Sequence, residues 1–301
     1  MKNEADADSS GELSYDVGQL KEIQFEADQN FQKADVKRQE ILDFGDEGFL
    51  LEKLLSQSEC DRLIQNGEEK GFDEIRGLND KYRSSQRIIL KNDNLSDILW
   101  DRIKDYLKDI VINGDPTEQH IHGLTPLLQG RWKPIGLNNM FRLCRYKAGG
   151  HFGPHFDGHY VRSTNERSLQ TLMLYLNGDF EGGSTNFIDE SQMIHMKDGK
   201  YCAEEKNILH QIKPDTGLGI IFNHHRLHEG EKLGNGRKYI LRSDIMYKNV
   251  DKTILDSKDE QAMLLVQEAE RKEASGDCME AAELYRKAFK LSPTVAEYYG
   301  S

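Results

Sequence analysis

The sequence predicts an α+β fold, in which a jelly roll (a double-stranded β-helix) has supporting N-terminal helices and a C-terminal α-helical hairpin. Three observations lead to this expectation. Between residues 139 and 248 the chain has short β-like runs broken by turn signals, upstream of them it has amphipathic helical patterns, and after residue 250 it becomes rich in Glu, Ala, Lys and Leu. Many short strands with such turns indicate a sandwich or barrel, and the jelly roll is one such form.

Composition bounds the class of protein. The chain has 301 residues, of which 37% are apolar and 31% charged, enough for one large domain or two modest ones. The formal net charge of −12 argues against nucleic acid or an anionic membrane as the main partner. No apolar run approaches a membrane span, and the first residues lack the apolar core of a secretory signal. The four scattered cysteines form no CxxC pair, which predicts reduced thiols in a cytoplasmic or nuclear protein.

Shifts in composition divide the chain into parts. Residues 1–17 are acidic and poor in large apolar residues, which predicts a disordered N-terminus. Residues 18–43 are highly charged with loosely spaced apolar side chains, and we expect a helical lead-in there. The main domain is expected at 44–250, with its jelly roll at about 139–248. The tail at 257–296 is the predicted helical hairpin.

Two amphipathic helices are expected before the β-rich region. Ser56 followed by Glu59 forms a capping box, and Gly71 ends the helix predicted at about residues 57–70. A second helix is predicted at 95–112, because apolar residues recur there at intervals of three and four. Both helices would cover a face of the sheet from outside.

The β-rich region contains strands of alternating character, whereas the Gly- and Pro-punctuated stretch 113–137 is an expected loop. The candidate strands are Phe141–Tyr146, Gln170–Leu176, Asn186–Phe187, Gly219–Asn223 and Tyr239–Tyr247. The alternation of side chains along a strand places Thr171 and Tyr175 on one face of theirs, and Lys238 and Arg242 on one face of the last.

A candidate metal site begins with His155-Phe-Asp157. Two such residues, two apart, point to the same side of a strand, and His228 lies 71 residues after Asp157. Two His and one carboxylate on one face of a metal leave its other face open, which is the arrangement of non-haem Fe(II) oxygenases. His224 and His225 are alternatives, but the Glu-Gly that follows His228 favours His228.

The order of these residues resembles the 2-oxoglutarate- and Fe(II)-dependent dioxygenases of the prolyl 4-hydroxylase type. The matching segments are Arg-Tyr146-Lys-Ala-Gly-Gly-His-Phe-Gly-Pro-His155-Phe-Asp157, Thr171-Leu-Met-Leu-Tyr175-Leu, Glu-Gly-Gly-Ser-Thr-Asn-Phe187, Pro-Asp-Thr-Gly217 through Phe222, and His228-Glu-Gly with Lys238 ten residues beyond. The likeness covers about residues 45–250. It implies that His155, Asp157 and His228 are the catalytic iron ligands.

The resemblance also implies a place for the co-substrate. Lys238 stands where the family has the basic residue that binds the far carboxylate of 2-oxoglutarate, and Tyr175 stands where a hydroxyl assists it. Thr171 would help from the same face, and Tyr146 would line the pocket. Arg242 is basic and in register with Lys238, so it is a second candidate anchor, although the spacing favours Lys238.

The implied activity is hydroxylation of an unactivated C–H bond, most of all in a protein or peptide side chain such as proline, with release of succinate and CO2. Fe(II), 2-oxoglutarate, O2 and ascorbate are the implied cofactors and co-substrates. Arg83 and Arg167 are the candidate substrate-binding residues. Two alternatives stay open: a dioxygenase of a small molecule, or a non-catalytic metal-binding jelly roll that serves as a scaffold through its helical tail.

The tail has a resemblance of its own. Ala262, Leu265, Ala269, Gly276, Asp277, Ala281, Tyr285, Ala288 and Pro293 fall at the positions of a single tetratricopeptide repeat. One repeat cannot bury its own face. The hairpin would therefore bind a protein partner or pack on the core, unless it is an ordinary helical hairpin without a recognition role.

Overall fold

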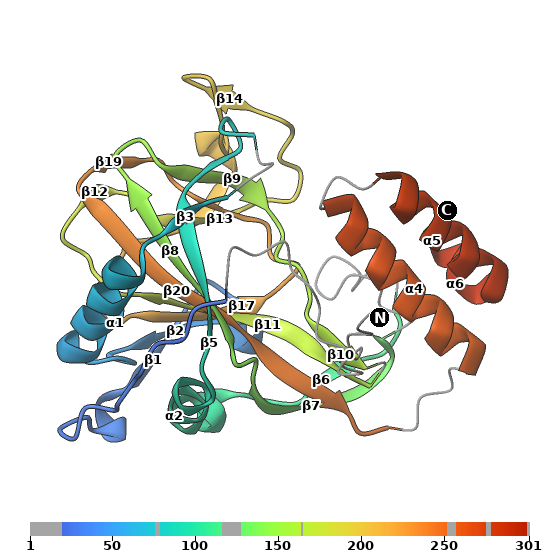
Figure 1. Cartoon of the computed structure of the whole chain (residues 1–301), viewed down its shortest axis with the longest axis horizontal. Helices are drawn as coiled ribbons and strands as arrows, with labels where there is room; N and C mark the ends of the chain where they lie inside the picture. Colours follow the sequence, from blue (N-terminus) through green and yellow to red (C-terminus); the bar gives the residue numbers. More distant parts are fainter. Residues whose placement is uncertain are drawn as a thin grey trace, which may run out of the picture.

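The computed structural model describes residues 20–75, 79–115, 128–163, 165–251, 257–274 and 278–299. The predicted disordered segment and the Gly276-Asp277 turn of the hairpin lie outside these residues. Two β-sheets face each other, two helices cover the outer side of the larger sheet, and three further helices lie to one side (Figure 1). The predicted jelly-roll class of fold, with its C-terminal helices, is confirmed.

The larger sheet has the strand order β1-β2-β17-β11-β20-β8-β5-β3, with β10 on β11 and β6-β7 joined to β20. Its pairs are antiparallel. The strands are β1 (Lys37–Glu40), β2 (Gly48–Glu52), β3 (Asp73–Glu74), β5 (Gln86–Lys91), β6 (Ile110–Ile112), β7 (Gly130–Leu137), β8 (Met140–Lys147), β10 (Val161–Ser163), β11 (Glu166–Tyr175), β17 (Gly219–Asn223) and β20 (Arg237–Asn249).

The smaller sheet has the order β16-β13-β18-β9-β4. Its strands are β4 (Arg83–Ser84), β9 (His151–His155), β13 (Thr185–Ile188), β16 (Ile208–Ile212) and β18 (His228–Gly230). Two short hairpins complete the β structure: β12 (Glu181–Gly182) with β19 (Leu233–Asn235), and β14 (Met196–Lys197) with β15 (Lys200–Tyr201). All five strands predicted from the sequence are present, each within a few residues of its expected bounds.

Alternation along the strands divides the core into two layers. On β11, Leu172 and Leu174 face the helices, whereas Met173 and Tyr175 face the smaller sheet. The layer between the sheets is aromatic, with Phe187 packed edge-on against Phe222. The predicted alternation is therefore confirmed, and it places Tyr175 in the space between the sheets.

Helices α1 (Gln57–Lys70) and α2 (Asp93–Ile103) cover the larger sheet from outside (Figure 1). The predicted capping box of α1 is present, since the Ser56 side chain accepts from the backbone N–H of Glu59 and the Glu59 carboxylate accepts from the backbone N–H of Ser56. Glu59 also accepts two hydrogen bonds, of 2.7 and 2.8 Å, from the buried guanidinium of Arg102 on α2. This fully buried ion pair joins the two helices.

The helical lead-in predicted at 18–43 is wrong. Its described part contains no α-helix: it runs mostly extended, with a turn at residues 29–30 and one 3-10 turn, η1 (Lys33–Asp35), before it enters β1. Ile23 and Val36 insert into the core as single buried side chains, which requires no helical spacing. The side chain of Asn92 donates to the carbonyl of Ile23, so tertiary contacts replace the bonds of a helix.

The second predicted helix is too long, and the expected loop 113–137 contains a strand. After α2 the chain passes through a 3-10 turn, η3 (Lys104–Tyr106), and then enters β6. Ile110 and Ile112 of β6 pair with β7, which also joins β20. Two more 3-10 turns occur, η2 (Gly45–Glu47) and η6 (Glu205–Asn207).

The C-terminal hairpin consists of α4 (Ser257–Ala274) and α5 (Cys278–Leu291), followed by a short helix, α6 (Pro293–Tyr299), that the sequence pattern did not indicate. Ala262 and Ala288 are fully buried, which permits close approach of the helices. The predicted hairpin is confirmed in its two main helices, and its likeness to a tetratricopeptide repeat stays a prediction.

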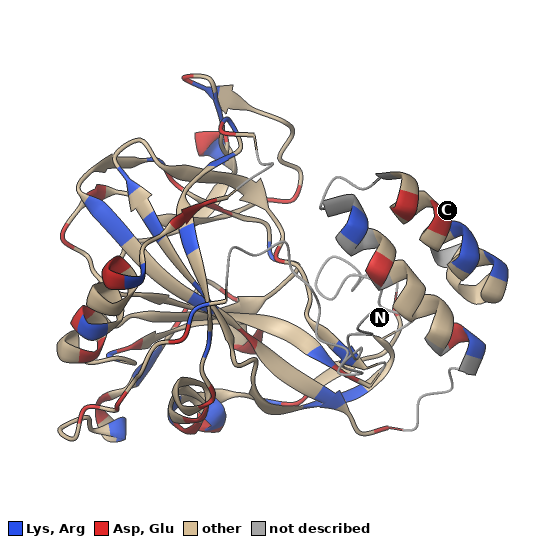
Figure 2. Cartoon of the chain, in the orientation of Figure 1, with Lys and Arg blue, Asp and Glu red and all other residues tan. Residues whose placement is uncertain are grey.

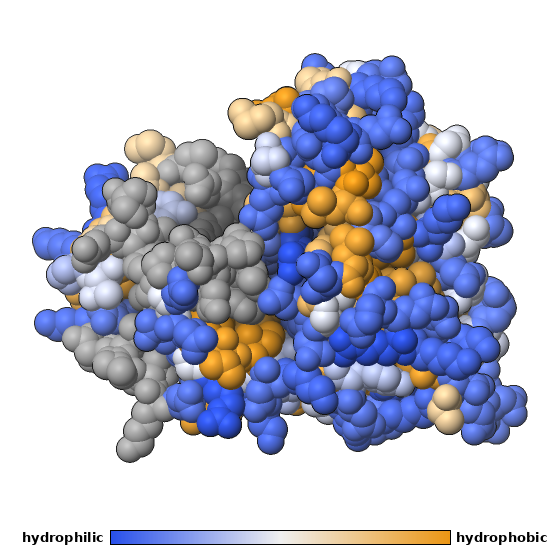
Figure 3. Space-filling model, turned by 180° about the vertical axis from the view of Figure 1, so that it is seen from behind, coloured by the Kyte–Doolittle hydropathy of each residue, from blue (hydrophilic) through white to orange (hydrophobic). Residues whose placement is uncertain are grey.

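Basic and acidic side chains are interspersed over the sheets and helices (Figure 2). Seen from behind, the surface is largely hydrophilic, with a band of hydrophobic residues across it (Figure 3). None of the helices in the described ranges is both long enough and apolar enough to cross a membrane.

Candidate metal and co-substrate site

Three predicted ligands meet at the smaller sheet. His155 ends β9 and His228 begins β18, and the two are direct partners in the antiparallel pairing. Asp157 lies just beyond β9, where its backbone N–H donates to the carbonyl of His224. Their ligand atoms lie within 4.8 Å of one another, and in the part of the chain that the structure describes no other group of three His, Cys, Asp or Glu does so.

The two imidazoles present free lone pairs to the same carboxylate. Nδ1 of His155 lies 2.8 Å from the carbonyl oxygen of Gly153, and Nδ1 of His228 lies 2.8 Å from that of Arg226. A carbonyl can only accept, so each Nδ1 carries the hydrogen and each Nε2 is left unprotonated. The two Nε2 atoms lie 3.8 and 3.9 Å from the oxygens of Asp157. Burial lowers the pKa of both histidines, which keeps them neutral.

Aromatic rings fix the planes of the two imidazoles. Phe152 stacks on His155 with ring centroids 3.5 Å apart. Phe222 meets His228 edge-on at 4.8 Å. These contacts orient both imidazole rings through protein side chains.

The carboxylate of Asp157 is held by two further groups. Thr171 on β11 donates its hydroxyl hydrogen to one oxygen at 2.6 Å, and Nη1 of Arg242 on β20 lies 2.9 Å from the other. Burial acts to raise the pKa of Asp157, but Arg242, His228, His155 and His224 together outweigh it and lower the pKa. Arg242 also approaches Asp244 at 3.5 Å. Asp157 is thus ionised and oriented.

A buried chain of hydrogen bonds continues behind Thr171. Because Thr171 gives its hydrogen to Asp157, it accepts from Nδ1 of His224 at 2.9 Å. Nε2 of His224 then accepts from the hydroxyl of Ser168 at 2.8 Å, and Ser168 accepts from the backbone N–H of Tyr160. Burial lowers the pKa of His224 to about 3, so it remains neutral and keeps this direction of donation.

Lys238 is a buried cation without an anionic partner. Its ammonium donates to the carbonyl of Gly183 and lies 5.4 and 5.2 Å from the ring centroids of Tyr146 and Tyr175. The Tyr175 hydroxyl is hydrogen-bonded to that of Thr185. No carboxylate among the described residues lies within 4.0 Å of this ammonium. Burial lowers the pKa of Lys238 to about 7.

The two candidate substrate-binding arginines occupy different places. Arg83 on β4 lies 4.2 Å above the ring of Phe152, the ring that stacks on His155, and it donates to Ser85. Arg167 is buried at the start of β11. Arg83 is therefore one ring away from the metal ligands, whereas Arg167 lies within the larger sheet.

Sequence reasoning missed the groups that hold Asp157. Thr171 and Arg242 were expected beside 2-oxoglutarate, and the structure instead places both on this carboxylate. His224 was weighed only as a ligand. A signal for the pairing of Arg242 was available: Asp244 follows it on the same face of the strand, which is typical of a charge network rather than of a lone anchor.

The donor set fits an Fe(II) ion. It consists of two neutral imidazole nitrogens and one ionised carboxylate, which is the set that non-haem iron sites use, and each ligand has a hydrogen-bonded partner behind it. The surroundings of Lys238 fit a carboxylate for a separate reason, because the buried ammonium has a carbonyl and two aromatic faces beside it and no carboxylate of the described residues within 4.0 Å.

A match to one protein family agrees with this donor set. Residues 141–243 match the family model of the 2OG-Fe(II) oxygenase superfamily. A comparison with curated proteins found no match.

Among solved structures, the chain is similar to a viral collagen prolyl hydroxylase of Paramecium Bursaria Chlorella virus-1 in complex with 2OG (21% identity, 69% of this chain and 99% of that chain covered, TM-score 0.41). It is also similar to a Pseudomonas putida prolyl-4-hydroxylase (12%, 68% and 94%, 0.39) and to a Trichoplax adhaerens prolyl hydroxylase in complex with a hypoxia inducible factor peptide fragment (13%, 66% and 83%, 0.42). The segment 141–243, which matches the 2OG-Fe(II) oxygenase superfamily model, is the segment that contains the His-Asp-His site.

Proposed function

We propose that the protein is an Fe(II)- and 2-oxoglutarate-dependent dioxygenase that hydroxylates an unactivated C–H bond in a protein or peptide side chain, such as a proline. One observation carries the proposal. Two neutral histidines with the ionised Asp157, and the buried ammonium of Lys238, which has no carboxylate of the described residues within 4.0 Å, both line the layer between the two sheets.

His155, Asp157 and His228 would hold the iron. The chemistry supplied there would be oxidative decarboxylation of 2-oxoglutarate to succinate and CO2, which would provide the oxidant for the C–H bond. The protein residues would do the rest. Thr171 and Arg242 keep the Asp157 carboxylate oriented, and the two aromatic contacts keep the imidazoles in plane.

Lys238 is the proposed anchor for the far carboxylate of 2-oxoglutarate. No carboxylate of the described residues lies within 4.0 Å of its ammonium, whereas Arg242 is already paired with Asp157 and Asp244. A carboxylate at Lys238 would offset the cost of burying the ammonium, which strengthens the case for this position over Arg242. Tyr175 and Tyr146 lie close enough to frame such a ligand with their rings.

The proposal of a peptide substrate rests on the resemblance and on the surroundings of the ligands. Phe156 stands between the two ligands His155 and Asp157 in sequence and is 46% exposed. Its ring stacks on His225 at 5.6 Å. An exposed, supported ring next to a metal ligand is suited to contact a side chain such as that of proline.

Succinate release tests the proposal. Purified protein with Fe(II) and 2-oxoglutarate should convert 2-oxoglutarate slowly without substrate, and a proline-bearing peptide library should stimulate the conversion and gain one oxygen by mass spectrometry. His155→Ala should abolish conversion, whereas His210→Ala, a matched change on β16 outside the ligand set, should not. Absence of conversion under all conditions would contradict the enzyme, and absence of stimulation by any peptide would contradict the substrate class. Omission of ascorbate from the same assay tests the ascorbate requirement.

A further inference from the structure

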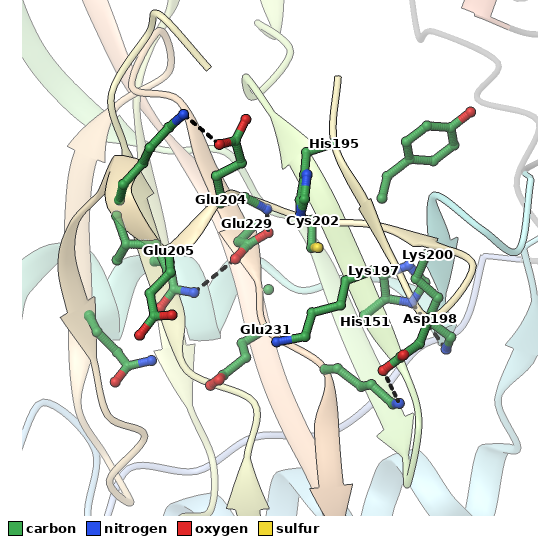
Figure 4. A pocket seen from close by; sticks show the side chains of 18 residues that line it. His151, His195, Lys197, Asp198, Lys200, Cys202, Glu204, Glu205, Glu229 and Glu231 are labelled. Atoms are coloured by element: carbon green, nitrogen blue, oxygen red, sulfur yellow. Dashed lines mark hydrogen bonds and ion pairs between the residues drawn. The ribbon is translucent and has the colours of Figure 1, made fainter. Parts of the chain in front are cut away.

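A cavity of about 1050 Å³ lies on the outer face of the smaller sheet (Figure 4). Its back wall is formed by Asn186 on β13 and Glu229 on β18. Side chains alternate along a strand, so these two point away from Phe187 and His228, their neighbours in sequence, which face the metal site. The hairpin β14–β15 and the turn η6 contribute the opposite wall. The cavity is thus separated from the metal ligands by one sheet.

The back wall contains an unsatisfied hydrogen-bond acceptor. Asn186 is 1% exposed, and its Nδ2 donates to Glu229 at 2.8 Å, which fixes the orientation of the amide. The other oxygen of Glu229 accepts from the backbone N–H of Ala203 at 2.7 Å. Oδ1 of Asn186 is buried and has no hydrogen-bond partner among the described residues. A buried acceptor of this kind costs stability unless a donor reaches it, so the site expects an N–H or O–H from a ligand.

The side walls carry opposite charge. In Figure 4, Lys197 and Lys200 lie on one side and Glu204, Glu205 and Glu229 on the other. Lys232 joins the basic side, where its nearest anion is Asp198 at 4.0 Å. On the acidic side Glu204 is paired with Lys206 at 2.7 Å, whereas Glu231 and Glu205 have no salt-bridge partner among the described residues. A ligand that spans the cavity therefore needs cationic or N–H groups at one end and an anion at the other.

One edge of the cavity is a free strand edge. β16 is the terminal strand of the smaller sheet, and its Ile208 and Gln211 line the cavity. Edge strands present unpaired backbone N–H and carbonyl groups, which an extended peptide can pair with. A free amino acid is too small to pair along this strand edge. It would also fill little of the cavity, whose volume reaches the upper end of the range for small-molecule sites.

We propose that this cavity is a second binding site, which takes a peptide segment bearing both a basic and an acidic side chain. It deepens the proposed function and rests on it in one respect, namely that the segment belongs to the protein substrate and lies outside the hydroxylated residue. The peptide donates to Oδ1 of Asn186, directs its basic side chain to Glu231 and Glu205, and directs its acidic side chain to Lys197 and Lys232.

Cys202, which lines the cavity, is a native reporter of occupancy. Its alkylation by iodoacetamide is followed by mass spectrometry in the full-length protein without iron or 2-oxoglutarate, at mildly alkaline pH because burial raises the pKa of this thiol. The probe is a short peptide of repeated Lys-Ala-Pro-Asp units. Matched peptides carry Gln for Lys or Asn for Asp.

Mixed-charge peptide at about ten times its Kd should slow alkylation of Cys202 about tenfold. The paired substitution Lys197→Gln and Lys232→Gln should remove most of this protection, whereas Lys248→Gln, a matched change at an exposed site on β20, should leave it intact. If free lysine plus aspartate protected Cys202 equally well, the ligand would be a small zwitterion and the peptide proposal would be wrong. If no peptide protected Cys202, the cavity would not be a binding site for such a segment.

The two proposals fail separately. Alkylation requires no turnover, so an inactive protein that still protects Cys202 would contradict only the oxygenase. Succinate release that responds to peptides, without protection of Cys202 by any peptide, would contradict only the second site.

Discussion

Replacement of Lys238 by Met separates the binding of 2-oxoglutarate from the stability of the fold. The side chain is 3% exposed, and its ammonium has a carbonyl but no carboxylate as partner. Met has a similar length and no charge, so it should fill the same space between Tyr146 and Tyr175. The variant should therefore fold and bind iron but bind 2-oxoglutarate poorly.

The magnitudes follow from burial. A lost charge-assisted contact of about 3 kcal/mol weakens 2-oxoglutarate binding by about 100-fold. Stability should move in the other direction. The pKa of Lys238 is about 7 in the folded protein, against an ordinary value of 10.5, so between these pH values the unfolded chain binds more protons. The Lys238 side chain therefore lowers the free energy of unfolding by about 4 kcal/mol at pH 7, and this cost disappears above pH 10.5. Lys238→Met removes this cost but also loses the hydrogen bond to Gly183, which lowers the stability gained by about 1–3 kcal/mol.

We expect Lys238→Met to raise the KM for 2-oxoglutarate about 100-fold while its urea midpoint at pH 7 stays equal or rises. Lys248→Met, on the exposed face of the same strand, is the control. An unchanged KM would show that Lys238 is not the anchor. A fall of several kcal/mol in the free energy of unfolding would show that the ammonium has a stabilising partner.

Three further predictions concern the same groups and the helical layer. Thr171→Val removes the hydroxyl that orients Asp157 and should lower the affinity for Mn(II), measured anaerobically by calorimetry, about 10–100-fold. Thr171→Ser should retain the affinity, and equal affinities of the two variants would mean that Thr171 contributes packing alone. Burial lowers the pKa of Lys238 to about 7, so 2-oxoglutarate affinity should be constant below pH 7 and fall about tenfold per pH unit above it. An affinity that stays constant from pH 6 to about 9 would contradict this titration of Lys238 in the free protein. Arg102→Met leaves the Glu59 carboxylate buried without its guanidinium partner and should lower the free energy of urea unfolding by about 3–5 kcal/mol. Because the pair is buried, added salt should not produce a similar loss in the unchanged protein.

The ends of several elements were predictable from the sequence because local rules determine them. Period-2 alternation placed Lys238 and Arg242 on one face of their strand, and Ser56 with Glu59 marked the start of α1. The resemblance then supplied what spacing alone does not, since a His-x-Asp motif is common by chance. Strand alternation and helix capping depend only on residues that are close in sequence.

What the sequence did not indicate depends on distant partners. The chain before β1 is extended because Ile23 and its neighbours are held by α2, which local charge patterns do not report. Arg242 is directed to Asp157 by the pairing of β11 with β20, a contact of residues 85 positions apart. The cavity behind the sheet likewise exists only because the segment after β13 folds back over Asn186 and Glu229.

The position of β20 has a consequence for synthesis of the protein. This strand lies between β11 and β8 in the middle of the larger sheet, yet in sequence it is the last strand of the described residues. Until the ribosome has released residues 237–249, β8 and β11 each have an open edge and neither Lys238 nor Arg242 is in place. A nascent chain or a truncated product that ends before β20 therefore exposes strand edges that pair readily with other chains, and it should depend on chaperones for its solubility.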